Sequence, residues 1–401
     1  MRGRLGVLFL AAIIGGGCAS QGTAASPADR VAPPSAASRS AEPTETAAFH
    51  GAVATYRGDP GRSGVMPGPG PGADPGIAWH FQALGPFGSS PAVIGGVVYA
   101  VSGEGVVHAL DLAVGSERWS ASLGSRASAS PLIVDELVIA ADEAGTVHAL
   151  QLADGSATWA TNTDGAITGS PALTDDRIVA ATQEGTVYAL DPKTGAVLWQ
   201  TAVGAPVARS VAVADGTIYL GLGGELVAVS ASDGSVLWRA AVAKDGTIGT
   251  PTAVGGRVFA ATGLDGEDPG SRGIGMVDAA TGDVGWRYAS PTKAQVYTPA
   301  VAGGRAYLVG HDRLVVALDA ATGEVAWSVT RNAELEALPA VVDGVVYIVG
   351  NGGPAEALDA TTGASMWSVP IQGIPFAPAV VDGYLLVGTS LGTLYAIGGP
   401  R

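Results

Sequence analysis

Cysteine is almost absent from this chain, which has one in 401 residues, Cys18. One thiol cannot form an internal disulfide, and it cannot build a metal site from several thiolates. Charged residues are also scarce, at 14% of the chain, and their balance gives a formal net charge of -15. Because nucleic acids and anionic lipid surfaces attract basic proteins, we expect neither as a direct partner.

The sequence also lacks the short motifs of common enzyme classes. It contains no G-x-S-x-G elbow, no phosphate-binding P-loop and no H-E-x-x-H zinc motif. Its five histidines do not cluster, and His108 and His148 occupy equivalent places in two repeats, where strand packing explains them. The residues therefore nominate no nucleophile, and we expect no metal site.

Tryptophan, in contrast, follows a regular spacing. Successive tryptophans lie 40, 40, 40, 39, 48, 41 and 40 residues apart, and none falls outside the series. A bulky residue that recurs at a fixed interval indicates repeated units in which each copy packs in the same way. We expect these residues to dock neighbouring units: Trp79, Trp119, Trp159, Trp199, Trp238, Trp286, Trp327 and Trp367.

Seven of the tryptophans follow a common motif, A-x-D-x-x-T-G-x-x-x-W. An apolar strand is expected to end at the Asp, whose carboxylate accepts a backbone N–H two residues on. Glycine then supplies the positive φ that closes a tight hairpin, and the next strand carries the tryptophan. Gln151 and Ser230 replace the Asp in two copies. The glycine is present in all seven: Gly115, Gly155, Gly195, Gly234, Gly282, Gly323 and Gly363.

Two earlier strands complete each repeat. A dipeptide such as Ser130-Pro131 or Thr250-Pro251 precedes a short apolar run, a Gly or Asp turn and a second β-rich run. Helical periodicity is absent, and four short strands add up to about 40 residues, the size of one propeller blade. The WD-type propeller has a similar period, but no tryptophan here is followed by Asp and no Gly-His pair opens the repeats.

Two deficits indicate eight blades. The last repeat stops after residues 394–396 without its hairpin and tryptophan strand, while Trp79 stands at the start with no hairpin before it. If the Trp79 strand pairs beside residues 394–396, every blade has four strands and the ring has no open edge. We predict an all-β, eight-bladed β-propeller closed in this way. Seven blades with a degraded repeat is the alternative.

These repeats resemble the pyrroloquinoline-quinone-like propeller family, which includes BamB-like outer-membrane assembly lipoproteins and quinoprotein alcohol dehydrogenases. The resemblance extends from Tyr56 to the C-terminus, and residues 56–64 look like the segment that precedes the first tryptophan strand in this family. Residues 57–59, Arg-Gly-Asp, also spell a cell-adhesion motif, which has no other support in the sequence.

The resemblance raises the question of a quinone cofactor. The dehydrogenases of this family hold the quinone between a tryptophan and a disulfide of adjacent cysteines, with calcium bound by Glu, Asn and Asp. Here that disulfide is impossible, and every tryptophan already belongs to the repeat. Fold resemblance alone does not transfer an activity, so we expect no cofactor, neither pyrroloquinoline quinone nor calcium.

The first residues read as a targeting signal. Arg2 and Arg4 precede an apolar run over residues 5–14 and three glycines before Cys18. This order predicts an export signal over residues 1–18, too short to span a bilayer, and resembles a bacterial lipoprotein site at Cys18. Gly15 departs from the aliphatic residue usual there, so a secreted form cut nearby is the alternative.

The expected domain organisation follows from this signal. Residues 19–48 are rich in Ala, Ser, Pro and Thr and are predicted to form a flexible tether, and residues 49–401 the propeller. The protein is then exported and lipid-anchored in the bacterial cell envelope, at the cell membrane or the outer membrane. It touches the membrane through its lipid anchor only.

A binding face is the remaining expectation. Loops between blades lie on one face of a propeller, and binding residues concentrate on such loops. An insertion at residues 263–275 lengthens the same face, and its spacing does not match an EF-hand, so a solvated insertion is expected rather than a cation site. The insertion offers Asp265, Glu267 and Asp268, and the linking loops offer Phe87, Arg126, Arg209, Lys244, Gln295, Tyr297, Glu334, Glu336 and Phe376.

The function predicted from the sequence is therefore a non-catalytic, monomeric envelope lipoprotein that binds or scaffolds a partner, either a protein or a polysaccharide. A quinone-dependent oxidoreductase and a polysaccharide-binding propeller are the alternatives.

Overall fold

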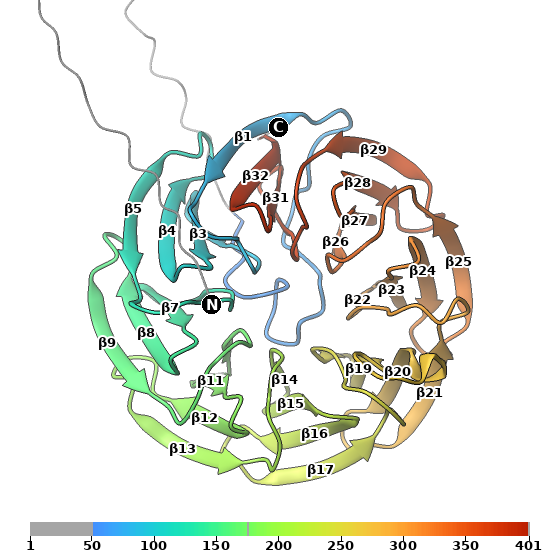
Figure 1. The fold of residues 1–401 in the computed structure, drawn as a ribbon, viewed down its shortest axis with the longest axis horizontal. Helices are drawn as coiled ribbons and strands as arrows, with labels where there is room; N and C mark the ends of the chain where they lie inside the picture. The colour runs from blue at the N-terminus through green and yellow to red at the C-terminus, as the bar shows by residue number, and fades with distance from the viewer. Residues whose placement is uncertain (1–50, 175, 400–401) are drawn as a thin grey trace, which may run out of the picture. The chain divides into compact units, whose positions relative to one another are not determined.

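The computed structural model describes residues 51–174 and 176–399, and nearly all regular structure in this part of the chain is β-strand. The strands form eight four-stranded sheets, arranged as blades around a ring (Figure 1). The prediction of an all-β, eight-bladed propeller is confirmed, and the seven-blade alternative is wrong. The predicted signal over residues 1–18, its Cys18 and the predicted tether over residues 19–48 lie outside the described residues.

The blades are named in chain order, each from its innermost strand outward. Blade 1 contains β2 (Ala92–Ile94), β3 (Val97–Ser102), β4 (Val106–Asp111) and β5 (Glu117–Ser122). Blade 2 contains β6 (Leu132–Val134), β7 (Leu137–Ala141), β8 (Thr146–Gln151) and β9 (Ala157–Asn162). Blade 3 contains β10 (Ala172–Leu173), β11 (Ile178–Ala181), β12 (Thr186–Leu190) and β13 (Val197–Ala202). Blade 4 contains β14 (Ala212–Ala214), β15 (Thr217–Leu222), β16 (Glu225–Ser230) and β17 (Val236–Ala241).

The second half repeats this order. Blade 5 contains β18 (Thr252–Val254), β19 (Arg257–Thr262), β20 (Gly273–Asp278) and β21 (Val284–Ala289), with a 3-10 turn, η1 (Pro269–Ser271), between β19 and β20. Blade 6 contains β22 (Ala300–Ala302), β23 (Arg305–Val309), β24 (Leu314–Asp319) and β25 (Val325–Thr330). Blade 7 contains β26 (Ala340–Val342), β27 (Val345–Val349), β28 (Pro354–Asp359) and β29 (Ser365–Pro370). Blade 8 contains β30 (Ala379–Val381), β31 (Tyr384–Gly388), β32 (Thr393–Gly398) and β1 (Ile77–Gln82).

Blade 8 joins the two ends of the propeller sequence. Its outer strand, β1, pairs antiparallel with β32, so that Trp79 lies opposite Ala396 and Phe81 opposite Leu394. Figure 1 shows β1 beside β32 at the junction of the first and last colours. A register shift interrupts this pair next to Trp79, and the same irregularity precedes the tryptophan on the outer strand of blade 1. β1 thus has the geometry of an outer blade strand.

Seven of the eight indoles rest on the hairpin of the next blade. The Trp119 Nε1 donates to the Leu152 carbonyl at 3.0 Å, and a Cβ on Gly155 would lie 2.6 Å from the Trp119 ring. Such a distance is sterically excluded, so the motif glycine provides both a positive φ, 73° here, and space for the indole. The same contact joins six other tryptophans to the six other motif glycines, which explains why the repeat keeps both residues.

The tryptophans are less enclosed than their docking role suggested. Trp79 and Trp367 are buried, with 8% and 9% of their surface exposed, while the other six are only partly buried on the outer strands. Trp367 faces blade 8, where the break between β32 and β1 replaces the hairpin, and its indole N–H has no hydrogen-bond partner among the described residues. The tryptophans of the outer strands, here called the outer belt, therefore make seven equivalent contacts with the next blade. The one exception is Trp367, at the junction between β32 and β1.

The hairpin itself forms as the motif predicts. The Asp191 carboxylate accepts the backbone N–H groups of Lys193 and Thr194 at 3.0 and 2.8 Å. A side-chain hydrogen bond from Thr194 is the main reason why the pKa of the exposed Asp191 carboxyl lies below its usual value. The motif Asp is therefore a turn residue rather than a functional acid. None of the helical segments in the described part of the chain has the length and hydrophobicity of a membrane span.

Candidate binding site

A ring of hydroxyl groups surrounds the centre of the propeller. The Ser170 hydroxyl accepts the backbone N–H of Ser130, and the Ser210 hydroxyl accepts that of Ser170, both at 2.9 Å. On the next blades, the Thr298 hydroxyl donates to the Thr250 carbonyl at 3.0 Å. These residues occupy the Ser/Thr positions that precede the innermost strands. Their hydrogen bonds link neighbouring blades near the centre of the ring, as the tryptophans link them at the outer strands.

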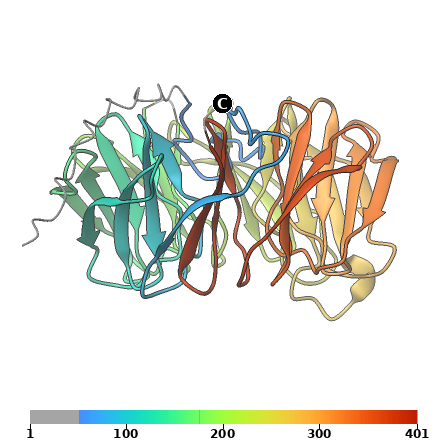
Figure 2. The same ribbon diagram turned by 90° about the horizontal axis from the view of Figure 1, so that it is seen from above.

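Residues 51–70, here called the crossing segment, run through the middle of the ring (Figure 1). The segment lies toward one face, and the insertion of blade 5 projects from the opposite face (Figure 2). Its backbone makes hydrogen bonds of 2.7–3.3 Å to seven blades: Val53 with Val93, Ala54 with Ile133, Pro60 with Val213, Gly61 with Ala253, Ser63 with Val301, Gly64 with Val341, and Gly68 with Asp382.

Two buried arginines complete these contacts. Arg62 is fully buried, and its Nη2 donates to the Ser170 and Pro171 carbonyls at 3.2 and 2.7 Å, which adds blade 3. Its other donors bond Val211, Thr55 and Tyr56. Burial lowers the pKa of Arg62 to about 10, still far above neutral pH, so the guanidinium stays charged.

Arg57 is buried in the same way. It is 1% exposed and donates to the carbonyls of Arg62, Thr298 and Pro299. An adhesion motif needs an accessible arginine, so the Arg-Gly-Asp at residues 57–59 has a structural role here. The segment therefore uses both arginines to bind backbone carbonyls at the centre of the ring.

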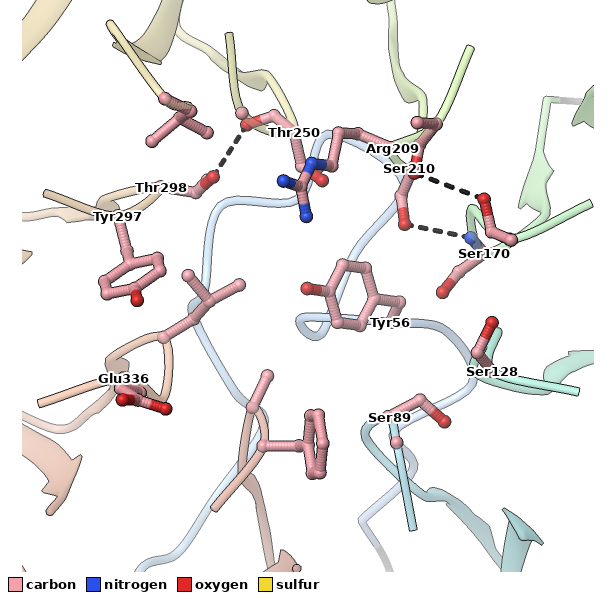
Figure 3. A pocket seen from close by; sticks show the side chains of 18 of the residues that line it. Tyr56, Ser89, Ser128, Ser170, Arg209, Ser210, Thr250, Tyr297, Thr298 and Glu336 are labelled. Atoms are coloured by element: carbon pink, nitrogen blue, oxygen red, sulfur yellow. Dashed lines mark hydrogen bonds between the residues drawn. The ribbon is translucent and has the colours of Figure 1, made fainter. Parts of the chain in front are cut away.

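A cavity of about 350 Å³ lies on the linking-loop side of the crossing segment. Tyr56 forms its floor and lies at the centre of the surrounding side chains (Figure 3). The Arg62 guanidinium carbon lies 5.4 Å from the centre of the Tyr56 ring and supports it from the segment. The wall consists of Gly88, Ser89, Ser128, Thr168, Ser170, Ala208, Arg209, Ser210, Gly249, Thr250, Leu264, Gln295, Tyr297, Thr298, Glu336, Leu338, Ile374, Pro375, Phe376 and Ala377.

The two charged side chains of the wall lie on different blades. Arg209 precedes blade 4, and Figure 3 shows its guanidinium extending toward Tyr56. Its Nη2 lies 3.8 Å from the Asp265 carboxylate, which belongs to the insertion of blade 5. Glu336 precedes blade 7 and accepts a hydrogen bond of 3.1 Å from the Asn351 amide. The wall thus offers a cation and an anion to a ligand.

Tyr297 lies between these charges along the wall. Burial, assisted by the nearby Glu336, raises the pKa of the Tyr297 phenol to about 12. Burial likewise raises the pKa of Tyr56. Both phenols are therefore neutral hydrogen-bonding groups at physiological pH, and Tyr297 is already bonded to His311.

The structure separates the residues expected on the binding face. Tyr297 and Phe376 line the cavity, together with Arg209, Gln295 and Glu336 from the same loops. The insertion contributes Leu264 to the wall, and Asp265 reaches Arg209. Four of the expected residues do not line the cavity: Arg126, Lys244, Glu267 and Asp268. The Asp268 carboxylate instead caps η1 by accepting a hydrogen bond of 2.8 Å from the Gly270 backbone N–H.

Phe87 requires a correction. Its side chain is 1% exposed and packs against Phe81 and His108, so it belongs to the core rather than to an accessible face. The wall also contains Tyr56, Ser89 and Ser128, which are not among the residues expected from the sequence. The hydroxyl residues could have been found from their fixed place before the inner strands, whereas Tyr56 lies outside the repeat and gives no periodic signal.

One arrangement resembles a hydrolase triad. The His108 Nε2 lies 3.0 Å from the Ser102 hydroxyl, and its Nδ1 lies 2.8 Å from the Glu117 carboxylate. Ser102 is completely buried, however, and Phe81 and Phe87 cover the His108 ring. A nucleophile must reach its substrate, so this group serves strand packing, as expected for His108. Among the described residues, no group of three or more His, Cys, Asp or Glu is placed to hold a metal ion.

Comparisons with known proteins agree with this fold. The family model described as outer membrane protein assembly factor BamB matches residues 73–210, 183–274 and 270–399. No curated protein sequence matches the chain.

Three solved structures illustrate the likeness. BamB from Moraxella catarrhalis has 20% identity and a TM-score of 0.67, covering 81% of this chain and 97% of its own. Quinohemoprotein alcohol dehydrogenase from Comamonas testosteroni has 16% identity and a TM-score of 0.68, covering 89% and 82%. A europium-containing methanol dehydrogenase has 12% identity and a TM-score of 0.70, covering 87% and 98%. BamB and two dehydrogenases share the fold, so these structures do not decide the activity.

The cavity wall does not match the ligand set expected for a quinoprotein. Of the residues that line it, none is tryptophan or cysteine, and Glu336 is the only carboxylate. The described tryptophans lie instead on the outer strands, where seven of them contact the next blade. A quinone held over a tryptophan and a calcium ion held by several oxygen ligands do not fit this set.

Proposed function

This chain belongs to the family of outer membrane protein assembly factor BamB, and from that premise we propose that it is a non-catalytic binding propeller of the cell envelope. The proposal assigns the binding role to the cavity on the linking-loop face. The partner is a protein that inserts a segment of its chain into the cavity.

The observation that carries this proposal is a cavity at the centre of the ring whose floor is formed by the crossing segment (Figure 3). The crossing segment hydrogen-bonds to blades all around the ring and closes the centre below Tyr56. Small and hydroxyl residues at the inner ends of blades 1–4 leave the space above it free, and loops with Arg209, Tyr297 and Phe376 border that space. Pockets of this kind, concave with a few polar groups, are the usual sites of recognition.

The wall composition supports a non-catalytic role. No serine or threonine hydroxyl that lines the cavity is hydrogen-bonded to a histidine or a carboxylate of the described residues, and the wall residues do not fit quinone and calcium. Incubation of the purified protein with pyrroloquinoline quinone and Ca²⁺ is therefore expected to give no dye-linked alcohol oxidation. Turnover above that of the free quinone would contradict the proposal and favour a quinone-dependent oxidoreductase.

Attachment at Cys18 completes the proposal. The sole cysteine follows an apolar run and three glycines, and acyl chains on it would hold the propeller at the envelope. Cys18→Ala is expected to release the protein from washed membranes into the soluble fraction. If the variant still sediments with the membranes, Cys18 is not the anchor, although the binding role of the cavity is unaffected.

Site-specific photocrosslinking in intact cells tests the binding role. A photoreactive amino acid at Gln295, in the wall, and at Leu198, an exposed position on outer strand β13, compares the two regions. We expect the Gln295 position, and a second wall position at Phe376, to give the same crosslinked protein. Equal yields from Leu198, or no product from either wall position, would contradict binding at the cavity.

A further inference from the structure

The cavity has two unlike sides. Blades 1–4 contribute hydroxyl groups together with Arg209, and blades 7 and 8 contribute the apolar side chains of Leu338, Ile374 and Phe376, with Glu336 as their one charged neighbour. In a ring of eight blades, blades 3 and 4 lie opposite blades 7 and 8, so the hydrogen-bond donors face an apolar surface across the cavity. A ligand that satisfies both sides carries an anionic group and an apolar group close together.

The donor side has hydroxyl protons without acceptors. The Ser170 and Ser210 hydroxyls each accept a backbone N–H, and neither donates its own proton to any residue that the structure describes. Ser170 is 6% exposed and Ser210 is 8% exposed, so these donors are buried at the wall of the cavity. Buried polar groups are normally paired, and two such protons in the same cavity wall as the Arg209 guanidinium indicate an oxyanion as the missing acceptor.

The insertion already presents a carboxylate to the same guanidinium. Asp265 lies 3.8 Å from Arg209 with 71% of its side chain exposed, so the pair is loose and accessible to solvent. An exposed ion pair of this kind stabilises by less than about 1 kcal/mol, and a ligand carboxylate can replace it. Asp265 therefore shows which chemistry Arg209 takes, and it competes for that position.

Size restricts the ligand further. A cavity of about 350 Å³ lies at the lower end of the range of roughly 300–1,000 Å³ for small-molecule pockets, so it admits the end of a chain rather than a folded surface. The geometry points to the free C-terminal carboxylate of a polypeptide whose last side chain is apolar. Arg209, Ser170 and Ser210 bind the carboxylate, Leu338, Ile374 and Phe376 contact the side chain, and Glu336 accepts a peptide N–H.

This inference rests on the proposed binding function and specifies its ligand. The direct test measures binding of N-acetyl-diglycyl-leucine and of its C-terminal amide to the purified protein by titration calorimetry. A charge-assisted hydrogen bond contributes roughly 1.5–3 kcal/mol, so the free acid is expected to bind at least about tenfold more tightly than the amide. Replacing leucine by glycine is expected to weaken binding by about tenfold as well, since it removes the apolar contact.

Variants locate the site. Arg209→Ala is expected to abolish the preference for the free acid, and Asp265→Asn to tighten binding of the acid by about two- to fivefold, because a competing carboxylate is removed. Arg118→Ala is the matched control, since Arg118 is 46% exposed and paired with Asp111 while Arg209 is 49% exposed. This control is expected to bind the peptide like the unmodified protein.

Several results would overturn the inference. It fails if acid and amide bind equally, if neither binds, or if Arg209→Ala keeps the preference while its melting temperature is unchanged. Equal binding of a C-terminally amidated peptide with an internal glutamate would assign the site to side-chain carboxylates instead. The proposed function is tested separately by photocrosslinking. Wall positions can crosslink a protein partner even when the free acid binds no more tightly than the amide.

Discussion

The outer belt and the crossing segment hold the same ring together in different ways. At the belt, seven tryptophans contact seven motif glycines, so each contact is one of many similar ones. The crossing segment is present once, yet its residues bond to all eight blades. Repetition makes the belt visible in the sequence and tolerant of a single loss, whereas the segment is a single element on which every blade depends.

Removing the segment is the strongest way to test this contrast. A chain that begins at residue 72 keeps β1 but loses every contact of the crossing segment. We expect its thermal midpoint to fall by more than about 10 °C relative to a chain that begins at residue 50, since 1 kcal/mol moves the midpoint of a large domain by ~2–4 °C. Scanning calorimetry measures the thermal midpoints of the two chains.

A chain that begins at residue 86 separates the contribution of β1. It also lacks the outer strand of blade 8 and leaves an unpaired edge on β32, so we expect it to aggregate. Moving residues 50–85 behind residue 401 through a Gly-rich linker is expected to restore much of the loss. Equal midpoints for chains beginning at residues 50, 72 and 86 would show that neither the segment nor β1 stabilises the ring.

The next largest loss of stability is expected from replacing a single side chain of the crossing segment, Arg62. Arg62→Met keeps the apolar stem but leaves the Ser170, Pro171 and Val211 carbonyls without their buried donor. Because each unpaired buried group costs roughly 1–3 kcal/mol, we expect a loss of about 3–5 kcal/mol in the free energy of unfolding by urea. A loss below 1 kcal/mol would mean that water replaces the guanidinium at the centre of the ring.

A belt tryptophan is expected to matter less. Trp199→Ala removes a partly buried indole and its 3.1 Å hydrogen bond to the Ala231 carbonyl. Full truncation of a core aromatic costs ~3–5 kcal/mol, and partial exposure reduces our expectation to about 2–3 kcal/mol. Trp199→Phe is expected to lose ~1 kcal/mol for the hydrogen bond. If Trp199→Ala destabilises more than Arg62→Met, the belt rather than the segment is the main support.

Two glycines separate turn strain from indole packing. Gly234 has a φ of 75° and Gly216 a φ of 69°, but a Cβ on Gly234 would lie 2.4 Å from the Thr201 hydroxyl and 2.6 Å from the Trp199 ring, and one on Gly216 would meet nothing within 4 Å. Alanine at Gly216 is expected to cost ~1 kcal/mol for its left-handed backbone. Alanine at Gly234 is expected to cost about 2 kcal/mol. Equal losses in urea unfolding would remove the packing role of the glycine.

The smallest expected effect concerns alkaline pH. In the folded protein the pKa of the Tyr297 phenol is about 12, above its ordinary value of 10.0. Between these two pH values Tyr297 keeps its proton in the folded state and loses it in the unfolded state. The contribution of Tyr297 is fully present below pH 10 and decreases as the pH rises toward 12. Tyr297→Phe is expected to lose stability less steeply over this range in urea titrations. Identical slopes would show that Tyr297 is not buried as described.

Parts of the candidate site were predictable for the same reason as the belt. The linking loops are defined by the repeat, so Tyr297, Phe376, Arg209, Gln295 and Glu336 could be assigned to one face before the structure was known. Phe87 stands at a similar place in the sequence but turns into the core between Phe81 of β1 and His108 of β4, because a side chain's direction depends on neighbours that lie on other strands.

The sequence by itself determined the number of blades, the hairpins and the partners of the belt, since a 40-residue period repeats the same local interactions until they are unmistakable. Only the tertiary structure decided where residues 51–70 lie, which carbonyls Arg57 and Arg62 bind, and that Tyr56 closes the floor of a cavity. These contacts join residues as far apart as Arg57 and Pro299, occur once, and leave no periodic pattern along the chain.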